Sequence, residues 1–169
     1  TPGLVDKINP DSLNHIITSF PFYGSSALFM LAGTPEGRQL LLQSQGLVEK
    51  ITQDSLNHII TSESHQGQSA LFALAKTAEG QQLLFQSQGL VDKITPDGLN
   101  HIIISGPNQG TSVLFMLAGT PKGRQLLLKT PGLVDKINPD SLNHIITSGL
   151  YHGASALFML AKTPKGRQL

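Results

Sequence analysis

Three residue types that hydrolases combine in catalytic triads occur together near the start of the chain: Asp11, Ser12 and His15. A triad requires a nucleophile and a base within hydrogen-bond reach in one asymmetric cleft. Here the set recurs every 43 residues, and Gly98 replaces the serine in the third copy. A residue set that is repeated along the chain and loses its nucleophile in one copy indicates a structural role. We therefore expect no enzymatic activity and no cofactor.

An asparagine followed by a histidine is a second recurring polar feature, at Asn14, Asn57, Asn100 and Asn143. One interpretation is a ladder of amides in a groove, pairing with the backbone of a bound peptide. The other, which we favour, is a set of hydrogen bonds at the junctions between copies. A metal site is not predicted. Equivalent residues of stacked helices lie about 10 Å apart, whereas zinc ligands reach one ion at about 2 Å.

A basic motif, Thr-Pro-Lys-Gly-Arg, occurs at 120–124 and 163–167 and could seat a phosphate at a helix N-terminus. The first copy has Glu36 in place of the lysine, and the second has Glu79 with Gln81 in place of the arginine. A phosphate track would not change sign between copies. The motif therefore predicts a solvated, capped turn, and no Walker loop or dinucleotide fingerprint is present.

The copies differ most around one glycine. Of the 38 columns that all four share, 22 hold one residue type, 11 hold two, and five hold three or four, and all five flank this glycine. Drift of a solvated loop is one explanation, but drift would also scatter over other exposed columns, and aromatic residues at a loop tip favour a contact surface. The predicted binding residues are Phe20, Pro21, Phe22, Tyr23 and Ser25; Glu63, Ser64, His65, Gln66 and Gln68; Pro107, Asn108, Gln109 and Thr111; and Leu150, Tyr151 and His152.

These residues are carried by a repeat of 43 residues. The phrase Gly-Leu-Val-Asp/Glu-Lys-Ile marks each start, at Gly3, Gly46, Gly89 and Gly132. One such unit cannot bury its leucines alone, but stacked neighbours can. We expect one repeat domain over 1–169, with units 3–45, 46–88, 89–131 and 132–169. The end units lack the polar faces of capping repeats, so we expect a piece of a longer array, or self-stacking of copies through the end units.

Each unit is predicted to contain about three helical segments and no strand. Asn9-Pro10 and Thr34-Pro35 have the form of an N-cap followed by a proline at the first helical position. The i, i+3, i+4 spacing of one apolar helical face occurs at Leu13, Ile16 and Ile17 and again at Leu28, Leu31 and Ala32. Gly46 suits the position just after a helix. The expected fold is an all-α solenoid.

The stretch Leu-Ala-Gly-Thr-Pro-Glu-Gly-Arg-Gln-Leu at 31–40, continuing to Gly46-Leu47-Val48, resembles the armadillo repeat. Units of that family also have an apolar helix ending in Leu-Ala, a short linker, and a glycine that opens a further helix. Their length matches the 43-residue period. The resemblance implies a superhelix whose inner groove binds proteins or extended peptides. Pro10 and its equivalents depart from it, because a proline would break the family's second helix.

A second stretch, Ile94-Thr95-Pro96-Asp97 followed by 102–105 and Gly110, resembles the transcription-activator-like effector repeat, although this unit is longer. That resemblance implies base-reading residues between the serine and the glycine. The phrase Gly-x-Ser-Ala-Leu-Phe also resembles the first helix of the ankyrin repeat. Asn108-Gln109 would suit base edges, whereas Tyr151 and the other aromatic residues favour a protein partner.

Composition narrows the function classes only in part. The chain has 169 residues, a net charge of +1, 39% hydrophobic residues and no cysteine, which excludes disulfides and thiolate metal sites. No apolar run is long enough to span a membrane, no signal peptide is recognisable, and the compartment stays open. The sequence predicts a scaffold that binds a protein or extended peptide through the variable loops. The alternatives are a modular DNA reader that uses the same loops, and a structural array or filament.

Overall fold

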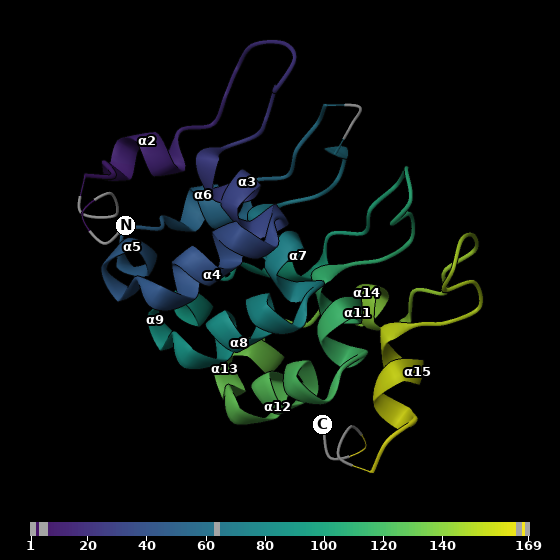
Figure 1. Cartoon of the computed structure of the whole chain (residues 1–169). Coiled ribbons are helices and arrows are strands. Elements are labelled where there is room, and N and C mark those ends of the chain that lie inside the picture. The colour runs from purple at the N-terminus through teal and green to yellow at the C-terminus, as the bar shows by residue number, and fades with distance from the viewer. Residues whose placement is uncertain (1–2, 4–6, 63–64, 165–166, 168–169) are drawn as a thin grey trace.

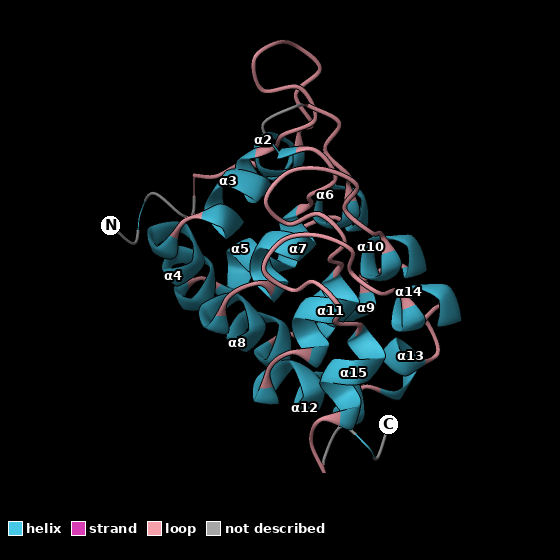
Figure 2. Cartoon of the chain, turned by 90° about the vertical axis from the view of Figure 1, so that its right-hand side faces the viewer, coloured by secondary structure: helices cyan, strands magenta, loops and turns pink. Residues whose placement is uncertain are grey.

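The structure, a computed structural model, describes residues 3, 7–62, 65–164 and 167. All regular secondary structure in these residues is helical (Figure 2), which confirms the all-α class. The helices fall into four sets, and within each set one helix follows another at intervals of about 43 residues. They are α2 (Pro10–Asn14), α6 (Gln53–Asn57), α10 (Pro96–Asn100) and α14 (Pro139–Asn143); α3 (Ala27–Gly33), α7 (Ala70–Ala75), α11 (Val113–Ala118) and α15 (Ala156–Ala161); α4 (Pro35–Gln43), α8 (Ala78–Gln86) and α12 (Pro121–Lys129); and α5 (Gln45–Glu49), α9 (Gln88–Asp92) and α13 (Pro131–Val134).

Each of the units 46–88 and 89–131 contains a helix from all four sets. The prediction of about three helical segments per unit is therefore wrong. The chain turns sharply at Ser44 (φ −129°, ψ 77°) and starts the separate helix α5 at once. This turn needs no left-handed residue. Gly46 consequently lies inside α5 with an ordinary negative φ, and not in the left-handed position after a helix.

Helix α2 ends at Asn14, earlier than the apolar spacing predicts. His15 is extended (φ −60°, ψ 124°), and the next two residues, Ile16 and Ile17, continue outside the helix. Two adjacent isoleucines have β-branched side chains that fit an extended backbone well. The apolar spacing of Leu13, Ile16 and Ile17 therefore does not mark one face of a helix. It arises because both isoleucine side chains are partly buried from an extended segment.

The predicted caps are present. The Asn9 side chain accepts a hydrogen bond from the Asp11 N–H at 2.9 Å, and the Thr34 hydroxyl accepts one from the Gly37 N–H at 3.2 Å. Each cap satisfies one N–H group that has no partner within its helix. The caps and prolines therefore fix where α2 and α4 begin.

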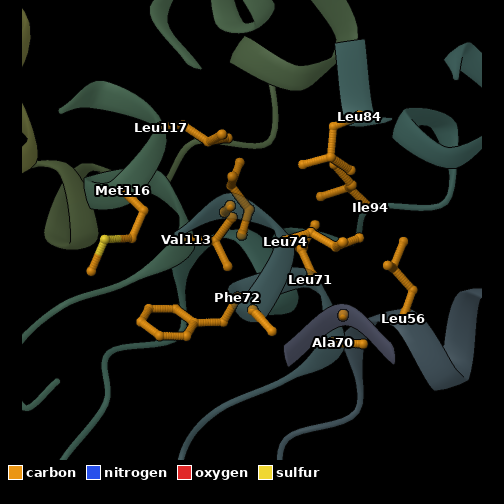
Figure 3. Close-up of a cluster of buried hydrophobic side chains, with 14 of the residues drawn as sticks. Leu56, Ala70, Leu71, Phe72, Leu74, Leu84, Ile94, Val113, Met116 and Leu117 are labelled. Carbon is orange, nitrogen blue, oxygen red and sulfur yellow. The ribbon is translucent and has the colours of Figure 1, made fainter. Parts of the chain in front are cut away.

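The core lies between equivalent helices. Helix α7 packs against α3 and α11, α11 packs against α15, and α8 packs against α4 and α12 (Figure 1). Leu56, Leu71 and Leu74 are fully buried as predicted, together with Ile60, whereas Ile59 is half-buried. Figure 3 shows Leu71 and Leu74 of α7 gathered with Val113 and Leu117 of α11. Apolar burial thus joins each copy to the next.

No helix within the described residues is long and apolar enough to cross a membrane.

Candidate binding surface

The variable columns lie in four long loops, each joining the first two capped helices of its copy: 15–26, 58–69, 101–112 and 144–155. The loops project from the same side of the molecule and form a row (Figures 1 and 2). Two predicted binding residues, Glu63 and Ser64, lie outside the described residues.

Each loop is closed at its base by the same pair of backbone hydrogen bonds. In the second copy, the Ile60 N–H donates to the Gln68 carbonyl and the Gly67 N–H donates to the Ile60 carbonyl, both at 2.8 Å. Gly67 has φ +80°, a conformation that favours glycine. A Cβ on this residue would lie 3.3 Å from the Ile103 Cα of the next copy. The invariant glycine therefore both turns the chain and lets neighbouring loops stack.

The loop tips expose large apolar side chains. Phe20 is 94% exposed and Leu150 is 89% exposed, while Phe22 and Tyr23 are each about half exposed. The predicted residues Pro21, Pro107, Gln109 and His152 are exposed too, and Gln66 is half-buried. The Gln66 amide oxygen accepts a hydrogen bond of 2.8 Å from the Ser105 hydroxyl of the next copy. These columns present side chains that a partner could reach.

One variable column contacts the preceding copy. The His65 ring packs edge-on against Phe29, and the Tyr151 ring packs in the same way against Phe115, with 5.1 Å between ring centroids in both pairs. Asn108, in the same column, is half-buried. This column can therefore set the position of a loop as well as contact a partner.

The last variable column points inward, so two of the predicted binding residues offer little surface to a partner. Ser25 and Thr111 are buried, with 3% and 1% of their surface exposed. Each belongs to the closing hydrogen-bond pair of its loop, directly before the serine that caps the following helix. The Thr111 hydroxyl also donates to the Asn108 carbonyl at 2.6 Å. Gln68, in the same column, is half-buried and lines a cleft between the first and second copies.

A groove of about 840 Å³ lies between the first two loops. Phe20, Phe22 and Tyr23 line it from the first loop, Met30 from helix α3, and His65 from the second loop. Pro21, Ser25, Thr61 and Ser62 complete the lining. The groove has the mostly apolar character, with a few polar groups, of sites that bind ligands.

The asparagine column lies at the junctions between copies. The Asn57 amide donates to the Gln53 carbonyl at 2.7 Å and to the Lys93 carbonyl at 2.8 Å, and its oxygen accepts from the Thr95 N–H at 3.0 Å. Asn14 and Asn100 make the same three bonds. Both amide hydrogens are used, so these side chains have no free donor for the backbone of a bound peptide. Asn143 donates to the Pro139 carbonyl.

A lysine column that the sequence analysis did not single out makes the reciprocal junction contact. The ammonium groups of Lys50, Lys93 and Lys136 donate to the carbonyls of Ile8, Ile51 and Ile94 at 3.0, 2.6 and 2.7 Å. This lysine is identical in all four copies. That identity was the available signal, because a solvated lysine would have been free to vary, as the columns of Lys76 and Lys122 do.

The basic motif caps a helix end. The Arg38 and Arg124 guanidinium groups donate to the Ala32 and Ala118 carbonyls at 3.0 and 2.8 Å. The Gln81 amide makes the equivalent bond to Ala75 at 2.6 Å. A neutral amide can replace the guanidinium because one hydrogen bond to a carbonyl suffices. The turn is capped as predicted, but these side chains are not solvated, since Arg38, Gln81 and Arg124 are all buried.

His101 is a half-buried side chain whose Nε2 has no hydrogen-bond partner in the described structure. Burial disfavours the charged ring and lowers the pKa of His101 from 6.5. Since the folded pKa lies below the unfolded one, its stability contribution is complete above pH 6.5 and is lost as the pH falls through the lowered value.

We therefore expect His101→Gln to flatten the loss of stability on acidification. Urea unfolding at about pH 7.5 and about pH 5 measures this. As the pH falls, His101 binds a proton more readily in the unfolded chain than in the folded one, so acid stabilises the unfolded state. Every other histidine is the same in both proteins, so the comparison isolates His101. An equal loss of stability in both proteins would contradict the expectation.

Among the described residues, no group of three or more histidine or acidic side chains is placed to hold a metal ion. Comparisons with protein-family models, curated proteins and solved structures return no match to this chain. The function is therefore inferred from the geometry of the loops.

Proposed function

We propose that the chain is an α-helical repeat scaffold of four stacked 43-residue units that binds an extended segment of another protein, and that it is not an enzyme. The observation that carries this proposal is the groove of about 840 Å³ between the loops 15–26 and 58–69, with its exposed aromatic wall. The armadillo resemblance of the sequence supports the same class of protein.

The side chains of the loop tips favour a protein partner. Phe20 exposes nearly its whole surface and lines the groove together with the half-exposed Phe22 and Tyr23. Grouped exposed apolar side chains are typical of interaction sites. Aromatic-lined grooves accept extended peptides, because the ring faces contact side chains and the groove needs no rearrangement. The rigid base of each loop, closed by two hydrogen bonds, limits the entropy lost on binding.

The charges of the same loops disfavour the DNA reader. None of the loops 15–26, 58–69, 101–112 and 144–155 contains a lysine or an arginine. Contacts between such cations and phosphates supply most of the non-specific affinity of DNA-binding proteins. Base contacts alone would have to hold the nucleic acid here.

A loop exchange tests the proposal. Replacing Phe20-Pro21-Phe22-Tyr23 by Gly-Pro-Asn-Gln gives the first copy the loop of the third, which the same scaffold already carries. Stability is expected to change by less than about 0.5 kcal/mol. Affinity for a peptide selected from a display library against the unaltered chain is expected to fall about tenfold or more, since the aromatic wall is lost.

The matched control is Glu36→Lys, which also copies a residue of the third unit but lies outside the loops. It should leave peptide affinity unchanged. Equal affinity of the loop variant and the unaltered chain would contradict the proposal. A salt titration separates the DNA alternative, because nucleic-acid affinity falls steeply with salt, whereas contact with aromatic side chains responds weakly.

A further inference from the structure

A second cleft, of about 490 Å³, lies between the first and second copies and adjoins the loop groove, since Met30 and His65 line both. Phe29 and Met30 of helix α3 and Ala73 of helix α7 form its apolar wall. Gly33, Thr34 and Pro35 line it from the end of the first helix, and Gln68 and Thr77 line it from the second copy. Its volume is that of a site for a small ligand or a side chain.

The cleft depends on two residues that differ between copies. The second copy has Ala73 where the others have Met30, Met116 and Met159. At the next junction, Met116 occupies the position equivalent to Ala73 and is 8% exposed. Gly33, on the other side of the cleft, has no side chain, whereas Lys76 occupies the equivalent position in the second copy. A missing methionine side chain at Ala73 therefore leaves this junction open.

The charged groups around the cleft have one sign. Arg38 and Lys76 line it, and no carboxylate does so in the described structure. Arg38 is 7% exposed, and its Nε has no hydrogen-bond partner. Glu79, which does not line the cleft, forms an ion pair with Arg38, with its Oε2 3.7 Å from that Nε. Lys76 is exposed, and its ammonium group makes no hydrogen bond or ion pair within the described residues. The cleft thus offers cations beside an apolar wall.

We infer that this cleft binds an acidic side chain, aspartate or glutamate, flanked by an apolar residue of the bound segment. This inference rests on the proposed peptide binding and names the chemistry of one part of the peptide. The apolar side chain packs against Phe29, Met30 and Ala73. The carboxylate accepts hydrogen bonds from Lys76 and Arg38, which are stronger than bonds between neutral groups.

The test uses two substitutions that copy residues of sister units. Ala73→Met closes the cleft, and Lys76→Gly removes the unpaired cation while leaving the apolar wall. Neither residue lies in one of the four variable loops. The probe is the peptide Gly-Ser-Leu-Glu-Ser-Gly with acetylated and amidated ends, so that its side chain carries the only anion. Binding is followed by amide chemical shifts of the whole 169-residue chain.

The unaltered chain should bind this peptide with shifts centred on Ala73 and Lys76. Changing the glutamate of the peptide to glutamine should weaken binding about two- to fivefold, the effect of one exposed ion pair. Lys76→Gly should cause a loss of the same size, and Ala73→Met should weaken binding about tenfold. If a glutamine peptide with a free C-terminal carboxylate binds as tightly as the glutamate peptide, the inference that the cleft binds an acidic side chain is overturned.

The inference is overturned if Ala73→Met leaves the affinity for the glutamate peptide unchanged while the denaturation midpoint stays at that of the unaltered chain. This outcome differs from failure of the proposed function, which is read from the loop exchange. If the loop variant loses binding of the selected peptide while Ala73→Met and Lys76→Gly have no effect, the loops are retained as a binding site and the cleft is not. If the cleft variants weaken binding and the loop exchange does not, the cleft is retained as a binding site and the loops are not.

Discussion

Replacing Gly80 with alanine is expected to lower the free energy of unfolding by about 3 kcal/mol or more, which is the range of a core clash. Alanine is ordinarily the better helix former by about 1 kcal/mol, so the expected sign is opposite to helix propensity. A Cβ on Gly80 would lie 2.5 Å from the Leu74 Cα and closer still to its carbonyl oxygen. These are backbone atoms of α7, so α8 would have to move away from α7. The same contact occurs at Gly37 and Gly123.

Gly89→Ala is the matched control. Gly89 also lies in a helix, α9, but a Cβ there would meet no atom within 4 Å. Here the helix propensity should prevail, and stability should rise by about 0.5–1 kcal/mol. Urea denaturation of both variants measures the difference. If Gly80→Ala and Gly89→Ala shift the stability in the same direction, the close approach of α8 to α7 is contradicted.

Asn57→Ala is expected to cost about 3 kcal/mol, because it removes three hydrogen bonds at once and leaves their partners without replacements. Two of these partners, the Lys93 carbonyl and the Thr95 N–H, belong to the next copy. The loss should therefore weaken the junction between the second and third copies. Chemical denaturation measures the cost, and affinity for a selected peptide, corrected for the folded fraction, should stay unchanged.

Asn143→Ala serves as the comparison within the same column. Asn143 is exposed, and in the described structure its amide donates only to the Pro139 carbonyl. Its replacement should cost about 0.5–1 kcal/mol, the value of one hydrogen bond. Equal costs at the two positions would show that the junction bonds do not stabilise the chain. A loss of peptide affinity at Asn57 beyond the unfolded fraction would restore the groove-ladder interpretation.

The sequence predicted well those features that depend on local chemistry. The cap at Thr34 and the burial of Leu71 and Leu74 follow from hydrogen-bonding groups and apolar residues near one another in the chain. The end of α2 at Asn14 was not predictable from spacing, because Ile16 and Ile17 fit the period of a helix. The extended course is fixed at Ile17, whose N–H donates to the Ser25 carbonyl and whose carbonyl accepts from the Gly24 N–H across the loop.

The candidate site was predictable by column but not by orientation. Variation located the loops, yet it could not show that Ser25 faces the core while Phe20 faces solvent. That division arises from the closing hydrogen bonds of the loop, which no local pattern encodes. The cleft at Ala73 was also hidden, because it exists only where this residue meets Met30 and Gly33 of the preceding copy.

Amide hydrogen exchange of the whole chain, with and without a peptide selected against it, tests binding through the loops most directly. We predict that the peptide slows exchange in the loops 15–26 and 58–69 and in α3, which line the groove. Helices α5, α9 and α13, which lie away from the loop tips (Figure 1), should exchange at unchanged rates. Protection concentrated in α5, α9 and α13, with the loops unaffected, would contradict the account.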